Sequence, residues 1–415
     1  MSESLIDRFL GKAIAKGRLS VTFPSGKRQE LGQPAEGFPE VAIRLTDSKV
    51  ARDILLDPRL GAGEAYMDGR IVIEQGDVMQ LVQLLRMNKP WERGGELRPP
   101  SPLRRIRDGL KFAATSFNEA RSSKRNVSHH YDIGNELYRL MLDPAHMQYS
   151  CAYWAEGVTT LDEAQEAKLA HIAAKLALSE GQRVLDIGCG WGGMAIYLAR
   201  HFNVGVHGIT LSEQQLALAK ERAKAAGVSG RVGFELVDYR DLAGRGEKFD
   251  RIVSVGMFEH VGRPQFETFF RCCANLLTDE GVMLLHTIGR FGGPGTTDAF
   301  TAKYIFPGGY IPALSVTLAA SEKTRLIHTD IETLRLHYAK TLRAWYTNCQ
   351  ANRDAIVSLF DDRFYRMWTF YLAGATAAFE YGGMGNYQIQ FARNRRTLPL
   401  TRDYIQGTET SLRPH

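Results

Sequence analysis

The sequence has no long hydrophobic run and few cysteines, and both features restrict what the protein can be. No apolar run approaches the ~18 residues that a helix needs to cross a bilayer. The five cysteines form neither a C-x-x-C pair nor an even set, so the sequence predicts no disulfide framework and no metal site. The stretch 5–14 contains charged residues and is therefore not the core of a signal peptide. We expect a protein of the reducing cytoplasm.

Composition and length indicate a globular protein with more than one domain. Of the 415 residues, 44% are hydrophobic and 24% are charged, which excludes a disordered, collagen-like or coiled-coil chain. The chain is too long for one domain of ~150 residues, and Pro99, Pro100 and Pro102 mark the clearest boundary. We predict a small N-terminal domain at 1–95 (scaffold, dimer surface or membrane docking), a basic linker at 96–125, a catalytic domain at 126–400 and a tail at 401–415.

The net charge of +6 is concentrated in one segment. Residues 91–125 contain nine basic and four acidic residues, so the rest of the chain is nearly neutral. Within this segment, 103–114 places apolar residues on one helical face, with Arg104, Arg105 and Arg107 beside them. This pattern is typical of a basic helix on an anionic membrane, and we predict peripheral binding to phospholipid on the inner membrane face. A solvated linker, or a helix packed on the next domain, explains the pattern equally well.

Hydrophobic periodicity predicts the fold class. In the first domain it predicts a helix over 5–14 and strands at 19–23 and 41–45. Thr160 and Glu163 form a capping-box pattern that predicts the start of another helix. Five predicted strands then alternate with helical stretches, at 183–187, 204–209, 232–237, 251–255 and 282–285. This order predicts an α/β fold with a doubly wound, Rossmann-like parallel sheet covered by helices on both faces.

A glycine-rich loop after the first of these strands predicts a cofactor site. Gly188, Gly190 and Gly192 follow Asp186 at the strand end, where glycines let the backbone turn sharply and approach a ligand. A dinucleotide loop has the different spacing G-x-G-x-x-G, and its diphosphate disfavours a neighbouring carboxylate. S-adenosylmethionine carries positive groups that Asp186 would favour. We therefore favour S-adenosylmethionine over a dinucleotide, and either of them over a turn without a ligand.

The next two strand ends are expected to complete this site. Thr210 ends the second strand and Gln215 follows one turn later; their side chains can hydrogen-bond ribose hydroxyls. Asp238 and Tyr239 follow the third strand, where the carboxylate can accept from the adenine amino group and the ring can flank the base. Because the carboxyl ends of parallel strands meet at one sheet edge, the three strand ends together predict one pocket.

Motifs along much of the chain resemble one family. They are HYDIGN at 130–135, MQYSCAYW at 147–154, DRIVSVGMFEH at 250–260, LLHTIG at 284–289, YIFPGG at 304–309 and AWY at 344–346. Together they resemble the cyclopropane-fatty-acyl-phospholipid synthase family over about 126–395, which implies the class I methyltransferase form of the predicted sheet. GEAYMDG at 63–69 resembles that family's smaller N-terminal domain.

The resemblance implies transfer of a methylene group from S-adenosylmethionine to a cis double bond of a phospholipid acyl chain, with bound bicarbonate as the base. It implies that the bicarbonate ion is held by Cys151, Glu259, His286, the backbone at Ile288, and Tyr346. It also implies that the cofactor contacts include Tyr149, Ser150, Gly188, Thr210, Leu211, Gln215, Tyr239 and Arg240. Apart from the family, Cys151, Glu259 and His286 each have a purely structural explanation as buried or strand-end residues.

The chemistry of this reaction fits the residues. Methyl transfer to an alkene leaves a carbocation, which must lose a proton without meeting water. Such a site needs a base, a dry channel and aromatic walls. Each aromatic face stabilises a desolvated cation by roughly 2 kcal/mol. The segment 345–391 holds twelve aromatic residues, most of which we assign to the core. Glycines at 292–295 and 308–309 would hinge a lid over such a channel.

Three other functions stay open at this point. A lipid C-methyltransferase would stop before ring closure and leave a methyl-branched or methylated unsaturated chain. Many members of the family carry a cysteine where this chain has Ala375, which excludes a mechanism that needs that thiol and makes the product less certain. An RNA methyltransferase lacks a recognisable nucleic-acid module, so we expect no nucleic-acid partner. A non-catalytic lipid carrier is the remaining alternative, and a homodimer is one use of the N-terminal domain.

Overall fold

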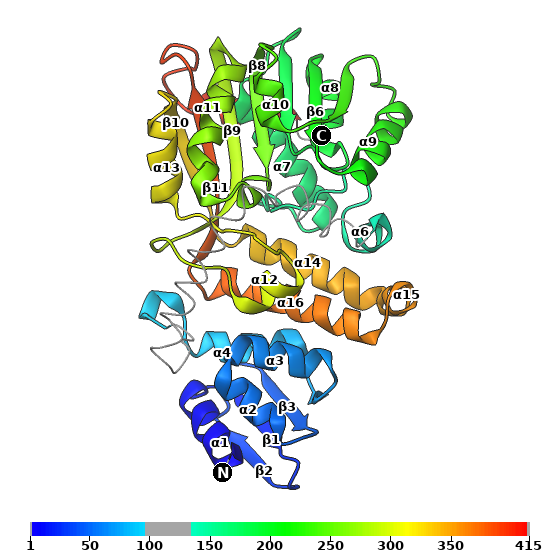
Figure 1. The fold of residues 1–415 in the computed structure, drawn as a ribbon, viewed down its shortest axis with the longest axis vertical. Coiled ribbons are helices and arrows are strands. Elements are labelled where there is room, and N and C mark those ends of the chain that lie inside the picture. Colours follow the sequence, from blue (N-terminus) through cyan, green and yellow to red (C-terminus); the bar gives the residue numbers. More distant parts are fainter. Residues whose placement is uncertain (1, 96–133, 413–415) are drawn as a thin grey trace. The chain divides into compact units, whose positions relative to one another are not determined.

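The computed structural model describes residues 2–95 and 134–412, and it divides the chain into two compact units (Figure 1). Of the described residues, the N-terminal unit comprises 2–95, 297–307 and 342–384, and the C-terminal unit comprises 134–296, 308–341 and 385–412. Two segments that we expected in the catalytic domain, 297–307 and 342–384, therefore belong to the same unit as the first 95 residues. The predicted basic linker at 96–125, with its predicted helix, lies outside the described residues.

The N-terminal unit contains a four-stranded sheet whose strand order is β2-β1-β3-β4. The predicted helix at 5–14 and the predicted strands at 19–23 and 41–45 are present as α1, β1 and β3. Burial alternates along β3, as the period-2 pattern requires, and Leu19 and Val21 of β1 belong to the same core as residues of α1 and α2. The elements are α1 (Ser2–Ala13), β1 (Arg18–Thr22), β2 (Arg28–Leu31), β3 (Glu40–Leu45), α2 (Lys49–Leu56), α3 (Pro58–Met67), β4 (Ile71–Gln75) and α4 (Val78–Met87).

Helices from later in the chain also belong to this unit, where they pack on α3, on α4 or on one another. They are α12 (Ala299–Tyr304), the second part of α14 (His337–Ala351), α15 (Arg353–Leu359) and α16 (Asp362–Glu380). A Cβ atom on Gly63 of α3 would lie 2.5 Å from the Phe300 ring and 2.9 Å from the Phe370 ring. The first glycine of the motif at 63–69 is therefore needed so that α12 and α16 can approach α3.

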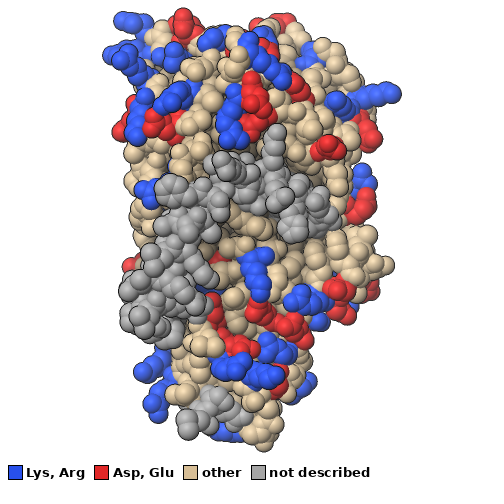
Figure 2. Space-filling model, viewed as in Figure 1, with Lys and Arg blue, Asp and Glu red and all other residues tan. Residues whose placement is uncertain are grey.

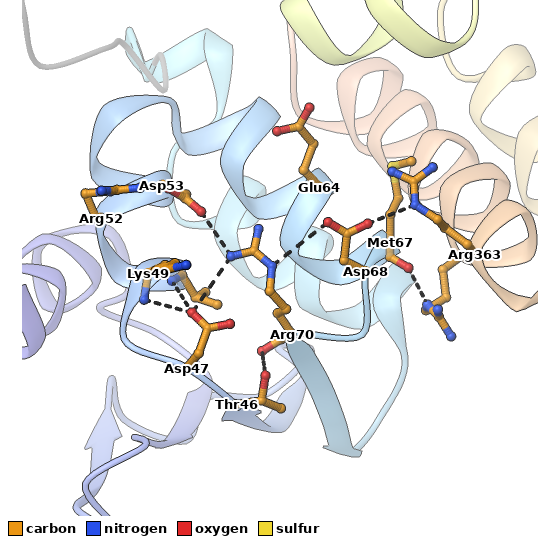
Figure 3. Close-up of polar contacts among 12 residues, drawn as sticks. Thr46, Asp47, Lys49, Arg52, Asp53, Glu64, Met67, Asp68, Arg70 and Arg363 are labelled. Carbon is orange, nitrogen blue, oxygen red and sulfur yellow. Dashed lines mark hydrogen bonds and ion pairs between the residues drawn. The ribbon is translucent and has the colours of Figure 1, made fainter.

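The rest of that motif forms a turn and an ion-pair cluster (Figure 3). Asp68 and Gly69 form a turn: Gly69 has φ 72° and donates its N–H to the carbonyl oxygen of Tyr66 at 3.0 Å. Arg70 pairs with Asp53 at 3.0 Å, and Arg363 pairs with Asp68 at 2.8 Å. Because these pairs are partly exposed, each stabilises the fold by at most about 1 kcal/mol and mainly fixes the turn.

The C-terminal unit contains a seven-stranded sheet with the order β10-β11-β9-β8-β5-β6-β7. The five predicted strands correspond to β5–β9, which pair in parallel in that part of the sheet. The other two strands, β10 and β11, were not predicted from the sequence, and they pair antiparallel to each other. The strands are β5 (Arg183–Ile187), β6 (Gly205–Thr210), β7 (Val232–Leu236), β8 (Phe249–Val255), β9 (Leu277–Arg290), β10 (Ile327–Leu334) and β11 (Met384–Ala392).

Helices cover both faces of this sheet (Figure 1). α7 (Leu161–Leu176) begins at the predicted capping box and packs on α8, β8 and β9. α11 packs on β9, α10 and α13. The end of the chain, which we expected to be a tail, forms α17 and contacts α7. The remaining helices are α6 (Asn135–Met141), α8 (Gly193–Phe202), α9 (Glu213–Ala225), α10 (Tyr239–Ala243), α11 (Phe266–Leu276), α13 (Leu314–Glu322) and α17 (Asp403–Leu412).

The described surface carries both signs of charge. Figure 2 shows basic and acidic side chains intermixed over the visible face. Most of the segment 91–125, which holds the excess positive charge, lies outside the described residues. Within the described parts of the chain, no helix combines the length and apolar character that a membrane span requires.

Candidate active site

A pocket lies at the carboxyl edge of the C-terminal sheet, where the ends of β5, β6, β7 and β8 meet. Register places these ends side by side, with Asp186 opposite Gly208 and with Val255 opposite His286. Eleven of the twelve predicted cofactor residues line the pocket: Tyr149, Ser150, Asp186, Gly188, Gly190, Thr210, Leu211, Gln215, Asp238, Tyr239 and Arg240. The twelfth, Gly192, is not among the lining residues.

The three glycines of the loop have different roles. Gly188 has φ 81°, and a Cβ atom there would lie 2.8 Å from Met257. Gly192 has φ 79° and packs against Phe234, where a Cβ atom would lie 2.7 Å from the ring, so this glycine serves packing at the start of α8. A Cβ atom on Gly190 would have no atom within 4 Å. The backbone at Gly190 therefore faces open space in which a ligand fits.

Asp186 supplies a buried negative group at the floor of this pocket. Its side chain is 2% exposed, and Oδ2 has no hydrogen-bond partner among the described residues. Burial raises the pKa of Asp186, and the nearby Lys168 opposes that shift. A carboxylate in this position fits the positively charged amino group or sulfonium of S-adenosylmethionine.

Lys168 on α7 holds the loop that contains Tyr149, Ser150 and Cys151. Its fully buried ammonium group donates to the Ser150 hydroxyl at 3.0 Å and to the side-chain oxygen of Gln148. Burial lowers the pKa of Lys168, whereas Asp143, Cys151 and Asp186 act to raise it. Lys168 thus lies close enough to Asp186 and to the predicted anion ligand Cys151 to affect the pKa of both.

Other contacts fix the same loop from two sides. The Gln165 amide donates to the carbonyl oxygens of Gln148 and Ser150, at 3.3 and 3.1 Å. The backbone N–H of Ala152 donates to the Thr341 hydroxyl at 3.1 Å. The loop therefore has little freedom, which suits a segment that presents adjacent side chains to two ligands.

The side chains after β6 and β7 are already hydrogen-bonded to one another. Thr210 Oγ1 lies 2.9 Å from Gln215 Oε1. Asp238 accepts from the guanidinium of Arg240 at 2.8 and 2.7 Å, and this pairing raises the pKa of Arg240. Tyr239 packs edge-on against Phe269 with the ring centroids 5.4 Å apart. Thr210 and Gln215 are thus held in one arrangement, and Asp238 contacts both Arg240 and the pocket.

Glu259 and Ile288 form a second polar group beside the pocket. Glu259 Oε1 accepts the backbone N–H of Ile288 at 2.6 Å, while Oε2 is buried and has no partner among the described residues. Burial raises the pKa of Glu259 to about 7, and the Ile288 N–H opposes that shift. Met257 and His260, which flank Glu259 in sequence, line the pocket. The structure thus brings two of the predicted anion ligands into contact near the cofactor site.

Cys151, His286 and Tyr346 are the other three residues predicted to bind the anion. Cys151 is 1% exposed, and its thiol donates to the carbonyl oxygen of Ala152 at 3.4 Å. Burial raises the pKa of Cys151, which keeps it a thiol that can donate a hydrogen bond. His286 lies two residues before Ile288 on β9 and is buried between two amide side chains. Tyr346 belongs to the N-terminal unit, where its hydroxyl lies beside Asp77.

Lys168, Gln165 and Asp143 were not predicted as site residues. The available signal was the spacing of Lys168, His171 and Lys175, which places three basic residues on one face of α7. That face would normally be assigned to solvent, yet all three side chains are buried against the sheet. Without knowing which strands lie beneath α7, the sequence gives no reason to expect carboxylates and amides there.

The fold and the pocket define a class I S-adenosylmethionine-dependent methyltransferase, an enzyme in which a parallel sheet presents the cofactor at its carboxyl edge. The chain belongs to the family described as mycolic acid cyclopropane synthetase, which matches residues 118–389. A family described as a domain of unknown function matches residues 6–90.

Individual relatives agree with this assignment. The chain is 38% identical to the cyclopropane-fatty-acyl-phospholipid synthase of Escherichia coli over 87% of this chain and 90% of that protein. The cyclopropane synthase MmaA2 from Mycobacterium tuberculosis matches with a TM-score of 0.61 and 33% identity, over 65% of this chain and 98% of that one. The same score, identity and coverage hold for the mycolic acid cyclopropane synthase CmaA1 complexed with SAH and CTAB.

Proposed function

We propose that this protein is a cyclopropane-fatty-acyl-phospholipid synthase that uses bound bicarbonate as its base. The observation that carries the proposal is the contact between Glu259 and the Ile288 N–H at the end of β9, next to the cofactor pocket. It provides a buried donor and a buried carboxyl group where the family resemblance expects an anion. The E. coli relative, which matches over most of both chains, supports a phospholipid acyl chain as substrate.

The residues suit this chemistry. S-adenosylmethionine supplies the methyl group, and bicarbonate supplies a base that is small enough to be enclosed. The Ile288 N–H now donates to Glu259, and the Cys151 thiol now donates to the carbonyl oxygen of Ala152. Each could donate to an anion in place of that partner. Because the pKa of Glu259 is raised to about 7, its carboxyl group can donate a proton to the anion or accept from its hydroxyl near neutral pH. Exclusion of water by the buried surroundings protects the cationic chain from hydrolysis.

Analysis of the lipid product tests this function. The purified protein is mixed with S-adenosylmethionine and vesicles of a phospholipid with cis-monounsaturated chains. We expect acyl chains that gain CH₂ and resist ozonolysis, because a ring has replaced the double bond. A gain of CH₂ with a double bond that ozone still cleaves would instead show a lipid C-methyltransferase. Unmodified lipid would contradict the proposal. So would methyl-labelled S-adenosylmethionine that transfers its label to added RNA and not to lipid.

We also propose that the enzyme reaches its substrate as a peripheral protein, through the basic residues at 96–125. Replacing Arg104 and Arg105 by Gln is expected to weaken binding to vesicles that contain anionic lipid by roughly 30-fold, at about 1 kcal/mol for each arginine. The loss should shrink as salt is added. The matched control replaces the exposed pair Arg395 and Arg396. Equal binding by the two double variants in vesicle sedimentation would assign Arg104 and Arg105 to a linker.

A further inference from the structure

We propose that Asn386 and Gln388 on β11 are positioning residues that hold His286 as a neutral imidazole in one tautomer. Their importance for turnover rests on the proposed function. The three side chains are each at most 1% exposed, and they form a row across β9 and β11. Neither amide was among the residues predicted from the sequence.

Each ring nitrogen of His286 faces one amide. Asn386 Nδ2 lies 2.6 Å from Nε2, and Gln388 Nε2 lies 3.1 Å from Nδ1. The amide oxygens, Asn386 Oδ1 and Gln388 Oε1, are buried without a partner among the described residues. A neutral imidazole has one N–H and one lone pair, so its two amide neighbours must present opposite atoms. If one amide is rotated by half a turn, its oxygen faces the ring N–H. That oxygen then accepts a hydrogen bond, and the ring N–H has a partner.

The direction of β11 separates the roles of the two amides. Arg393 donates its N–H to the carbonyl oxygen of Gly281, near the start of β9, so β11 runs antiparallel to β9. Asn386 therefore lies nearer than Gln388 to the carboxyl edge, where Ile288 meets Glu259. Gln388 fixes the ring from the interior, and Asn386 contacts the nitrogen that lies toward the predicted anion.

The surrounding charges also favour a neutral ring. Burial lowers the pKa of His286, and Lys168, Lys175 and His171 on α7 lower it further. Glu332 on β10 acts in the opposite direction but pairs with His171 and Lys175. A ring that stays neutral makes and receives hydrogen bonds but is a poor proton acceptor. The proton released on ring closure therefore needs a base other than His286.

The protonation state of His286 can be measured directly without substrate. The protein is labelled with ¹⁵N-histidine, and the His286 signals are identified among the eleven histidines by their loss in His286→Gln. We expect one neutral tautomer, unchanged from about pH 6 to about pH 9. A mixture of tautomers, or protonation within that range, would overturn the inference. Since this readout needs no turnover, it can fail or hold independently of the proposed function.

Variants of Gln388 test how the ring is held. Gln388→Met removes one amide, and we expect a mixture of tautomers and a kcat lower by about 10- to 100-fold, with KM for S-adenosylmethionine within about 3-fold. Gln388→Glu places a carboxylate at Nδ1 and should give a protonated ring near neutral pH. The matched control is Gln390→Met on the same strand, because Gln390 contacts Lys175 and Tyr404 instead of His286.

A normal kcat and a single tautomer in Gln388→Met would contradict the proposal, as would equal losses in Gln388→Met and Gln390→Met. If Gln388→Met does not fold, the ¹⁵N signals of His286 in the natural protein and in Gln388→Glu still decide whether the amides hold the ring in one neutral tautomer.

Discussion

The cofactor pocket and the polar row beneath α7 lie in the same unit but are built in different ways. The pocket is lined by short stretches at the ends of β5, β6 and β7, together with the loop at 147–150. The polar row consists of His286 on β9 with Asn386 and Gln388 on β11, two strands that are far apart in sequence. The pocket is formed largely by backbone shape, whereas the row depends on tertiary packing.

This difference has a functional meaning. A pocket with glycines and strand-end polar groups can bind a cofactor that enters and leaves. The row is almost fully buried, so its polar atoms must satisfy one another or a bound ligand. Changes in the row should therefore affect turnover or stability strongly, while changes in the loop should affect cofactor binding.

The largest expected effect separates chemistry from binding. Glu259→Gln should lower the rate of methylene transfer by about 10³-fold, because the amide can no longer exchange a proton with an anion. Affinity for S-adenosylmethionine, measured by calorimetry, should stay within about 3-fold. Glu221→Gln on the exposed face of α9 is the control. A near-native rate in Glu259→Gln would show that this carboxyl group does not serve the base.

A second test compares a buried ion network with a surface pair. His171 donates to Glu332 at 2.6 Å and also pairs with Glu409. Burial acts to lower the pKa of His171, but these two hydrogen bonds raise it overall. His171→Gln should lower the free energy of unfolding by about 3 kcal/mol, because it leaves buried carboxylates unpaired. His207→Gln breaks the more exposed pair with Glu235 and should change the free energy of unfolding by less than about 1 kcal/mol.

The pH dependence of that loss has a defined sign. Because the pKa of His171 is raised from its ordinary value of 6.5, its stabilisation is complete below 6.5 and disappears as pH rises through the folded-state pKa. The pKa of Glu332 is lowered, so its stabilisation disappears as pH falls below its ordinary value of 4.5. The free energies of unfolding of the natural protein and of His171→Gln, measured in urea, should therefore differ most between pH 4.5 and pH 6.5. An equal difference in alkaline solution would contradict this assignment.

The smallest expected effect concerns the glycine loop. Gly188→Ala adds a Cβ atom at φ 81° and 2.8 Å from Met257. We expect about 1–2 kcal/mol lower stability and roughly 10-fold weaker binding of S-adenosylmethionine. Gly230→Ala, where a Cβ atom would meet nothing within 4 Å, should change the stability by less than about 0.5 kcal/mol. Matching results for the two glycines in urea unfolding and calorimetry would mean that Gly188 is not required by its conformation.

The same contrast explains what the sequence could predict. The five parallel strands and the capping box at Thr160 depend on local patterns, and all were found. β11 was missed because its buried polar residues, Asn386, Gln388 and Gln390, do not form the apolar pattern of a buried strand. The joining of 297–307 and 342–384 to the first domain depends on contacts such as Phe300 against Gly63, which no local pattern encodes.

Among the site residues, the strand-end groups of the pocket followed from topology. Cys151, Glu259, His286, Ile288 and Tyr346 came from the family resemblance. The structure joins Glu259 to Ile288 and buries Cys151 and His286 in the same unit. Tyr346 lies in the other unit, and its part in the anion site stays a prediction.

The most direct test of the account is the dependence of methylene transfer on bicarbonate. Protein dialysed into buffer free of carbon dioxide is assayed on unsaturated phospholipid vesicles, with bicarbonate added back in steps. We expect the rate to fall when bicarbonate is removed and to return along a saturating curve, while the rate of Glu259→Gln stays about 10³-fold lower at every concentration. A rate that is unchanged without bicarbonate would contradict the claim that an enclosed anion takes the proton.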